Sequence, residues 1–187
     1  MIDLKKIKLI IWDLDDTLWT GTLSEGGYQL PESHCQLIKD LTDVGIVNSI
    51  CSKNEYEPTK DELIRIGLWE YFVFTSINWD NKGIRIKHLI DNMALRPTNV
   101  LFIDDNTFNL QEAKHCSPDL HIATPEIIPK IIEQLKLLDK KDTSHKRLSQ
   151  YKILEEKAIA AETYDSNEAF YNFATISMYC NTNIARI

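Results

Sequence analysis

One short stretch near the N-terminus constrains the fold most: an apolar run that ends in a cluster of carboxylates. The first strand is predicted over Ile7 to Trp12, because its apolar run from Leu9 has the length and the β-branched content of a buried parallel strand. Asp13, Asp15 and Asp16 follow at once, and because Asp is a poor strand former, we expect them at the strand's carboxyl end. Side chains alternate along a strand, which would place Asp13 and Asp15 on one side. Two carboxylates this close repel each other unless a cation or a shared proton lies between them, so a metal-binding or acid–base role is expected.

The rest of the chain alternates between strand and helix patterns. Further strands are predicted over residues 46–51, 71–74, 100–103 and 120–123, and helices over 31–44, 59–66, 81–95, 107–116 and from 124 onward. This alternation predicts an α/β fold with a Rossmann-like parallel sheet, strand order 5-4-1-2-3, and helices on both faces. Ligands of such sheets bind beyond the carboxyl ends of the strands, where the strand order reverses. Asp104 and Asp105 follow the fourth strand, so we expect them to meet Asp13 and Asp15 there.

Composition narrows the class of partner and the compartment. The net charge of −7 argues against a nucleic-acid partner and against an anionic membrane surface. The first apolar run is too short for a signal peptide or a membrane span. The cysteines show no zinc-type spacing and are expected to be free thiols: Cys35, Cys51, Cys116 and Cys180. We therefore expect a cytoplasmic protein without nucleic-acid or membrane partners.

The acidic cluster and three later segments resemble the motifs of a known superfamily. The segment Asp13–Thr17 resembles the DxDxT motif of the haloacid dehalogenase-like (HAD) phosphatases. The other three motifs of that superfamily are matched in order: Ser52 follows the second strand, Lys82 opens a helix, and Asp104 with Asp105 ends the fourth strand. The resemblance implies a phosphatase that uses Mg²⁺ and forms an aspartyl-phosphate intermediate on phosphate esters.

The resemblance also implies a role for each residue. Asp13 would attack phosphorus, and Asp15 would protonate the leaving oxygen and then activate water. Lys82 would offset the negative charge on Asp13 and on the transferring group, and would count among the catalytic groups. Ser52 and Lys82 would bind the phosphate, with Asn54 either helping them or serving as a turn residue.

Magnesium would be held by oxygen ligands at the same place. The resemblance implies Asp13, the backbone carbonyl of Asp15, and Asp104 as the ligands. Asp105 could replace Asp104 as the direct ligand, or support it, and both alternatives stay open. Thr17 is expected to support the loop around Asp13 by hydrogen bonding. The tryptophans that flank the motifs are predicted to pack in the core, with a platform for the substrate as the alternative: Trp12, Trp19 and Trp79.

A narrower resemblance is to the FkbH-like subfamily, whose members join a HAD domain to a downstream acyltransferase-like domain. It rests on Trp12–Trp19, Ser52–Asn54, Asn78–Asp80 and Phe102–Asn106. Members are implicated in removing phosphate from a phosphoglycerate and loading the glyceryl unit onto a carrier protein. The resemblance implies a HAD-like phosphatase domain over residues 1–140. Residues 141–187 would be a helical tail or linker toward a missing downstream domain, with helices over 149–162 and 168–173 and a strand over 175–180. The expected partners are a small phosphorylated metabolite and, through that domain, an acyl carrier protein.

The resemblance also predicts how open the site is. Residues 20–30 allow only a small hairpin flap where HAD proteins carry a cap, so an open site of the capless (C0) type is expected.

Two other functions are alternatives to a phosphatase. A phospho-accepting module resembling a receiver domain is discounted, because the phosphorylated Asp of a receiver domain follows the third strand, and the third strand here ends in Thr75-Ser76. A scaffold that does not hydrolyse phosphate is the other alternative, and the presence of all four motifs argues against it.

Overall fold

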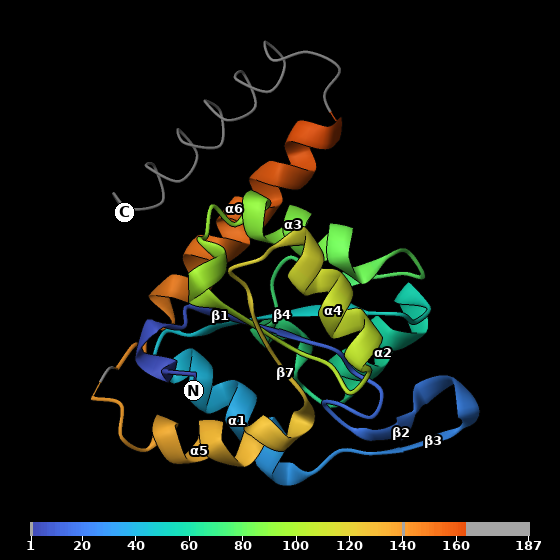
Figure 1. Cartoon of the computed structure of the whole chain (residues 1–187), viewed down its shortest axis with the longest axis horizontal. Coiled ribbons are helices and arrows are strands. Elements are labelled where there is room, and N and C mark those ends of the chain that lie inside the picture. The colour runs from blue at the N-terminus through green and yellow to red at the C-terminus, as the bar shows by residue number, and fades with distance from the viewer. Residues whose placement is uncertain (1, 140, 164–187) are drawn as a thin grey trace, which may run out of the picture.

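The computed structural model describes residues 2–139 and 141–163, which form a five-stranded parallel sheet between two layers of helices (Figure 1). The strands, in spatial order, are β5 (Ser76–Ile77), β4 (Val47–Ser52), β1 (Leu9–Trp12), β6 (Val100–Ile103) and β7 (His121–Ala123). Numbered along the chain, these strands have the order 3-2-1-4-5, which is the predicted order read from the opposite edge. The prediction of a Rossmann-like α/β fold is therefore confirmed.

Helices cover both faces of the sheet, as expected. They are α1 (Glu32–Asp43), α2 (Tyr56–Arg65), α3 (Lys82–Asn92), α4 (Thr107–Cys116), α5 (Ile128–Leu135) and α6 (Lys146–Thr163). Short 3-10 helices span Leu4–Lys6, Leu23–Glu25, Trp69–Tyr71, Pro97–Asn99 and Pro125–Ile127. Among the described helices, none combines the length and the apolar character that crossing a membrane requires.

The alternation of side chains along β1 separates two hydrophobic cores. Ile10 and Trp12 pack with residues of α1, α2 and α5, whereas Leu9 and Ile11 pack with residues of α3, α4 and α6. Figure 1 shows the corresponding layers, with α1 and α5 on one side of the sheet and α3, α4 and α6 on the other. All four of these strand residues are fully buried, so β1 forms the centre of the molecule.

The third strand lies later in the chain than predicted. Residues 71–74 were expected to be extended, but Trp69–Tyr71 is a 3-10 helix and Phe72 makes only an isolated bridge with Asn48. Phe74 then adopts a left-handed backbone conformation, with φ of 50°, which interrupts an extended strand. Pairing with β4 resumes at β5, so this prediction had the right neighbour but the wrong boundaries.

A small hairpin stands where the flap was expected. Strands β2 (Thr20–Thr22) and β3 (Gly27–Gln29) pair antiparallel and follow β1 directly. No larger insertion follows a strand of the sheet within residues 2–139. The prediction of a flap without a large cap is therefore confirmed.

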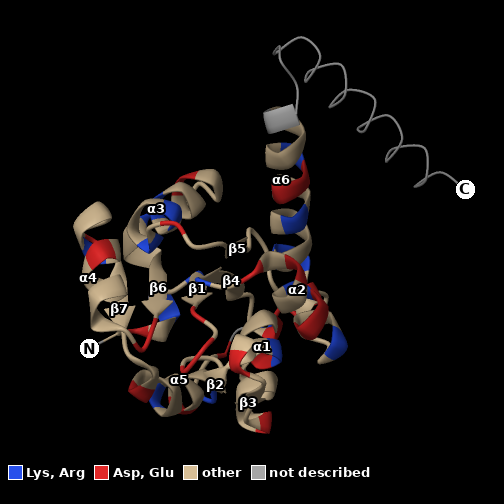
Figure 2. Ribbon diagram, turned by 90° about the vertical axis from the view of Figure 1, so that its right-hand side faces the viewer, with Lys and Arg blue, Asp and Glu red and all other residues tan. Residues whose placement is uncertain are grey.

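Helix α6 begins three residues before its predicted start, because Asp142 caps it. The Asp142 carboxylate accepts hydrogen bonds from the backbone N–H groups of Lys146 and Arg147, each at 3.0 Å. Leu148 is buried in the core beside α3, and Glu155 accepts a 2.6 Å hydrogen bond from the N–H of Phe74. Figures 1 and 2 show α6 along the side of the domain and projecting beyond it. The helix predicted over 168–173 and the strand over 175–180 lie outside the described residues.

A buried arginine on α3 holds the loops at the carboxyl edge of the sheet together. Arg85 donates to the carbonyls of Ser52 at 2.9 Å, Asn78 at 2.8 Å and Asp80 at 3.3 Å. It also donates to Ser76 through both the hydroxyl, at 2.9 Å, and the carbonyl. One planar guanidinium therefore fixes the end of β4, the strand β5 and the loop before α3, which a single ammonium could not do.

Arg85→Lys should lower the free energy of unfolding by about 2–3 kcal/mol, because the buried carbonyl of Ser52 and several partly buried acceptors lose a charged donor. Urea denaturation measures this change. Arg96→Lys is the matched control, since Arg96 is exposed, and it should leave the urea midpoint unchanged. Equal midpoints for Arg85→Lys and the wild type would contradict a structural role for Arg85.

Glu155→Gln should remove a pH dependence of stability. Burial raises the pKa of Glu155 above its ordinary value of 4.5, although hydrogen bonds from Phe74 and Thr75 oppose the shift. The folded protein thus binds this proton more tightly than the unfolded chain. Its contribution to stability is full below the unfolded pKa and is lost as pH rises through the folded pKa. Urea denaturation from about pH 4 to about pH 7 should show wild-type stability falling relative to Glu155→Gln. A difference in the free energy of unfolding between the two proteins that stays constant over this pH range would contradict the prediction.

Candidate active site

The sequence-predicted site residues converge at the carboxyl edge of three neighbouring strands. Asp13 follows β1, Ser52 ends β4, and Asp104 with Asp105 follows β6. β1 lies between β4 and β6, so the sheet alone brings these ends together. Lys82 reaches the same place from the first residue of α3.

A buried lysine joins two of the carboxylates. Lys82 Nζ lies 2.8 Å from Asp13 Oδ1 and 2.7 Å from Asp104 Oδ2, and Ser52 Oγ donates to Asp13 Oδ1 at 2.6 Å. Lys82 is 1% exposed, so its charge depends on these partners. Burial acts to lower the pKa of Lys82, but the two carboxylates outweigh burial and raise it above its usual value. The lysine therefore stays protonated beside Asp13.

A glycine allows the lysine to reach this position. A Cβ atom on Gly83 would lie 2.6 Å from the carbonyl oxygen of Glu112 and 2.9 Å from Cys116 Sγ. Helices α3 and α4 therefore approach each other more closely than any residue but glycine permits. Because α4 follows the loop that carries Asp104, this contact sets the distance between Lys82 and Asp104.

The two consecutive acids after β6 differ in their surroundings. The carboxylate of Asp104 is fully buried and accepts from Asn106 N at 2.9 Å and from Asn109 Nδ2 at 3.1 and 3.2 Å, besides its contact with Lys82. Asp105 is exposed, and its backbone N–H donates to Thr17 Oγ1 at 3.0 Å. Asp104 is thus fixed by protein donors on both oxygens, whereas Asp105 faces solvent beside the cluster.

The acidic cluster suits a divalent cation. Oxygens of Asp13, Asp104 and Asp105 all lie within 4.8 Å of one another. Burial raises the pKa of Asp13, and Asp104 raises it further against the opposing effect of Lys82. Partial burial, followed by repulsion from Asp13, raises the pKa of Asp105. A cation bound between these oxygens would stabilise the ionised carboxylates against burial and mutual repulsion. Oxygen atoms are the ligands that Mg²⁺ prefers.

Asp15 lies beside this cluster but has its own contacts. Strand β1 ends at Trp12, so a turn rather than strand alternation places Asp15. In that turn Asp16 has φ of 50°, and its carboxylate accepts from Gly21 N at 2.7 Å. Asn54 Nδ2 donates to Asp15 Oδ2 at 3.1 Å and to Ser52 Oγ at 3.2 Å. Asn54 is therefore bonded to protein groups, and its phosphate-binding role stays a prediction.

Several residues of the site were missed, or misplaced, by sequence reasoning. Arg85 and Asn109 hold the loops and Asp104, and no motif spacing distinguishes them from surface residues of a helix. Trp12 and Trp19 are buried as predicted, but the prediction is wrong for Trp79, which is 63% exposed. Its indole donates to the exposed Glu55 at 2.9 Å, which requires no burial.

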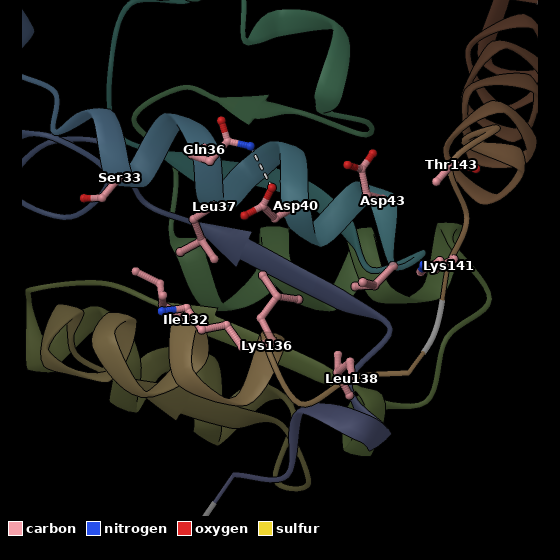
Figure 3. A pocket seen from close by; sticks show the side chains of 12 residues that line it. Ser33, Gln36, Leu37, Asp40, Asp43, Ile132, Lys136, Leu138, Lys141 and Thr143 are labelled. Carbon is pink, nitrogen blue, oxygen red and sulfur yellow. Dashed lines mark hydrogen bonds between the residues drawn. The ribbon is translucent and has the colours of Figure 1, made fainter.

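A hollow of about 500 Å³ lies away from these groups, between α1 and α5. Figure 3 shows Leu37, Ile132 and Leu138 among its apolar walls and the hydrogen bond from Gln36 to Asp40 at its rim. None of the acidic cluster lines it. The sequence-predicted site residues therefore lie at the strand ends and not in this hollow.

Comparisons with known proteins bear on the fold. No protein-family model and no curated protein matches the chain. The N-terminal part of protein BF1531 from Bacteroides fragilis, containing a phosphatase domain complexed with Mg, is similar at TM-score 0.60 and 22% identity; the match covers 72% of this chain but only 41% of that one. The cobalt-bound deoxy-D-mannose-octulosonate 8-phosphate phosphatase from Haemophilus influenzae is similar at TM-score 0.54 and 16% identity, over 91% of this chain and 99% of that one. A structure from Legionella pneumophila, assigned to HAD-superfamily (subfamily III A) hydrolases, is similar at TM-score 0.52 and 18% identity. That match covers 83% of this chain and 87% of the other. The chain has the fold of the HAD-superfamily phosphatases.

Proposed function

We propose that the chain is a Mg²⁺-dependent phosphatase that hydrolyses phosphate monoesters through an aspartyl-phosphate on Asp13. One observation carries the proposal: Asp13, at the strand-order reversal, is contacted by Lys82 at 2.8 Å and Ser52 at 2.6 Å, with two more carboxylates in reach. A carboxylate nucleophile beside a fixed cation and a hydroxyl donor is what phosphoryl transfer requires, because positioning and charge stabilisation supply most of its catalysis.

The reaction would proceed in two steps. A carboxylate oxygen of Asp13 attacks phosphorus, the ester P–O bond breaks, and the leaving oxygen takes a proton from Asp15. Water then attacks the phosphorus of the aspartyl-phosphate and gives a proton to Asp15, which releases phosphate and restores the Asp13 carboxylate. Lys82 stays charged throughout and offsets negative charge on Asp13 and on the transferring group. The products are one alcohol and one phosphate for each ester and water consumed.

We assign the metal to Asp13, Asp105 and the backbone carbonyl of Asp15, with Asp104 adding charge and holding Lys82. The choice of Asp105 instead of Asp104 as the ligand is supported by the exposure of Asp105 and by the protein donors that bind both oxygens of Asp104. When bound, Mg²⁺ would reduce repulsion between Asp13 and the phosphoryl oxygens.

We also propose the narrower function that the FkbH-like resemblance implies. In it, residues 1–140 remove phosphate from a phosphoglycerate, and residues 141–187 lead to a domain that loads the glyceryl unit onto an acyl carrier protein. A hairpin in place of a large cap supports a site that is open to a large partner. A small phosphorylated metabolite as the substrate and a cytoplasmic location belong to the same proposal.

Phosphate release from a panel of small phosphate esters tests the main proposal. Release should require Mg²⁺, stop with EDTA, and fall by at least about 10³-fold in Asp13→Asn, because the nucleophile is lost. Circular dichroism of the variant controls for folding. A folded protein that binds Mg²⁺ but releases no phosphate would instead favour the scaffold alternative.

Separate substitutions of the two acids after β6 test the metal assignment. Asp105→Asn should raise the Mg²⁺ concentration for half-maximal activity by about 10-fold or more and leave the fold intact. Asp104→Asn should instead lower the free energy of unfolding by about 3 kcal/mol, because a buried partner of Lys82 is lost. Asp119→Asn, at an exposed position after α4, is the matched control. If Asp104→Asn alone raised the Mg²⁺ requirement, the assignment would be reversed.

A further inference from the structure

We propose that the β2–β3 hairpin fixes the carboxylate of Asp15 so that Oδ2 is the oxygen that gives and takes the proton, with Trp19 as the positioning residue. This inference rests on the proposed phosphatase function and deepens it. It concerns the rotation of one carboxylate, which the motif does not specify.

Trp19, which directly precedes β2, and Leu23, in the connection between β2 and β3, donate to the same oxygen of Asp15. Trp19 Nε1 donates to Asp15 Oδ1 at 2.8 Å, and the backbone N–H of Leu23 donates to it at 3.1 Å. A carboxylate oxygen has two lone pairs in its plane, so these two donors fill Oδ1. Oδ2 accepts only one protein hydrogen bond among the described residues, from Asn54 at 3.1 Å, and keeps a lone pair for a proton.

The oxygen with the free lone pair is also the one that hydrogen bonds link to the reacting carboxylate. The amide of Asn54 that binds Asp15 Oδ2 also lies 3.2 Å from Ser52 Oγ. Ser52 in turn donates to Asp13 Oδ1 at 2.6 Å. Asp15 Oδ2 is therefore linked to Asp13 through two buried side chains, whereas Oδ1 is turned toward the hairpin.

The hairpin is itself anchored, so it can hold Trp19 in place. Trp19 is 1% exposed and packs against Tyr28 of β3, with ring centroids 4.7 Å apart and the ring planes tilted by 40°. The Tyr28 hydroxyl donates to Glu62 on α2, and Arg65 binds the same carboxylate at 2.6 Å. A chain of contacts thus runs from α2 through Tyr28 and Trp19 to Asp15. Loss of the indole donor would free the carboxylate to rotate and misplace its proton.

The leaving group distinguishes a misplaced acid from a damaged fold. An alkoxide is a poor leaving group and needs the proton from Asp15 as the P–O bond breaks. A 4-nitrophenolate leaves without that proton. With the aryl ester, Asp15 first releases its unused proton to solvent. The second step then needs Asp15 as a base with either ester, because water attacks the same aspartyl-phosphate.

The experiment compares kcat/KM for an alkyl phosphate and for 4-nitrophenyl phosphate in the wild type, Trp19→Phe and Tyr28→Phe, with saturating Mg²⁺. Trp19→Phe keeps an aromatic ring against Tyr28 but removes the indole N–H. It should lower kcat/KM for the alkyl ester by about 10-fold or more and for the aryl ester by less than about 2-fold. It should also give a pre-steady-state burst of nitrophenol, because the second step becomes limiting. Tyr28→Phe removes the hydrogen bond to Glu62 and keeps both aromatic rings. It should change the ratio of the alkyl to the aryl kcat/KM less than Trp19→Phe does.

Trp79→Phe is the matched control, since it removes an indole donor from Glu55 instead of Asp15, and it should leave the ratio unchanged. An equal loss for both esters in Trp19→Phe, or no loss, would overturn the inference, as would the same shift in Trp79→Phe. The proposed function is tested separately in the same assay by wild-type turnover of the aryl ester and its loss in Asp13→Asn. If Trp19→Phe unfolds, an unchanged ratio in folded Tyr28→Phe overturns the inference.

Discussion

The buried ammonium of Lys82 is the interaction on which the arrangement of this site depends. It lies between Asp13 and Asp104, from two neighbouring strands, and is almost inaccessible to water. Two carboxylates could not be buried side by side without it, and the lysine could not be buried without them. The close contact of α3 and α4 at Gly83 and the guanidinium of Arg85 both serve to keep α3 where this ion triad is satisfied.

The strand ends and the helices behind them have different tasks. Asp13, Ser52 and the Asp104–Asp105 pair come from strand ends, whose position is fixed by the hydrogen-bonded sheet. The orientation of the carboxylates comes from groups outside the sheet: Asn109 on α4 for Asp104, and Trp19 with the hairpin residue Leu23 for Asp15. The sheet therefore sets which residues meet, and the surrounding elements set how each carboxylate is turned.

Much of this could be predicted from the sequence because the relevant signals are local. The strands before Asp13 and Asp104 could be predicted because each is an apolar run that ends in acidic residues. The parallel topology then predicted that Asp13 and Asp104 lie close together. The third strand was misplaced because the left-handed Phe74 has no sequence signature, unlike a glycine at such a position. The contacts of Arg85 with the strand-end loops and of Trp19 with Asp15 were missed, because their partners are distant in sequence or placed by a turn. Trp79 was misjudged because hydrophobicity indicates burial only on average.

The packing of α6 has a consequence for how the protein behaves in a crowded solution. β5 is a two-residue strand at the edge of the sheet, and Phe74 and Thr75 before it line one hollow together with Glu155, Ala158 and Ile159 of α6. The carboxylate of Glu155 accepts a hydrogen bond from the backbone N–H of Phe74, which would otherwise be free to donate to an incoming strand. Edge strands recruit foreign strands through such free donors, so α6 protects this border against aggregation by β-strand addition.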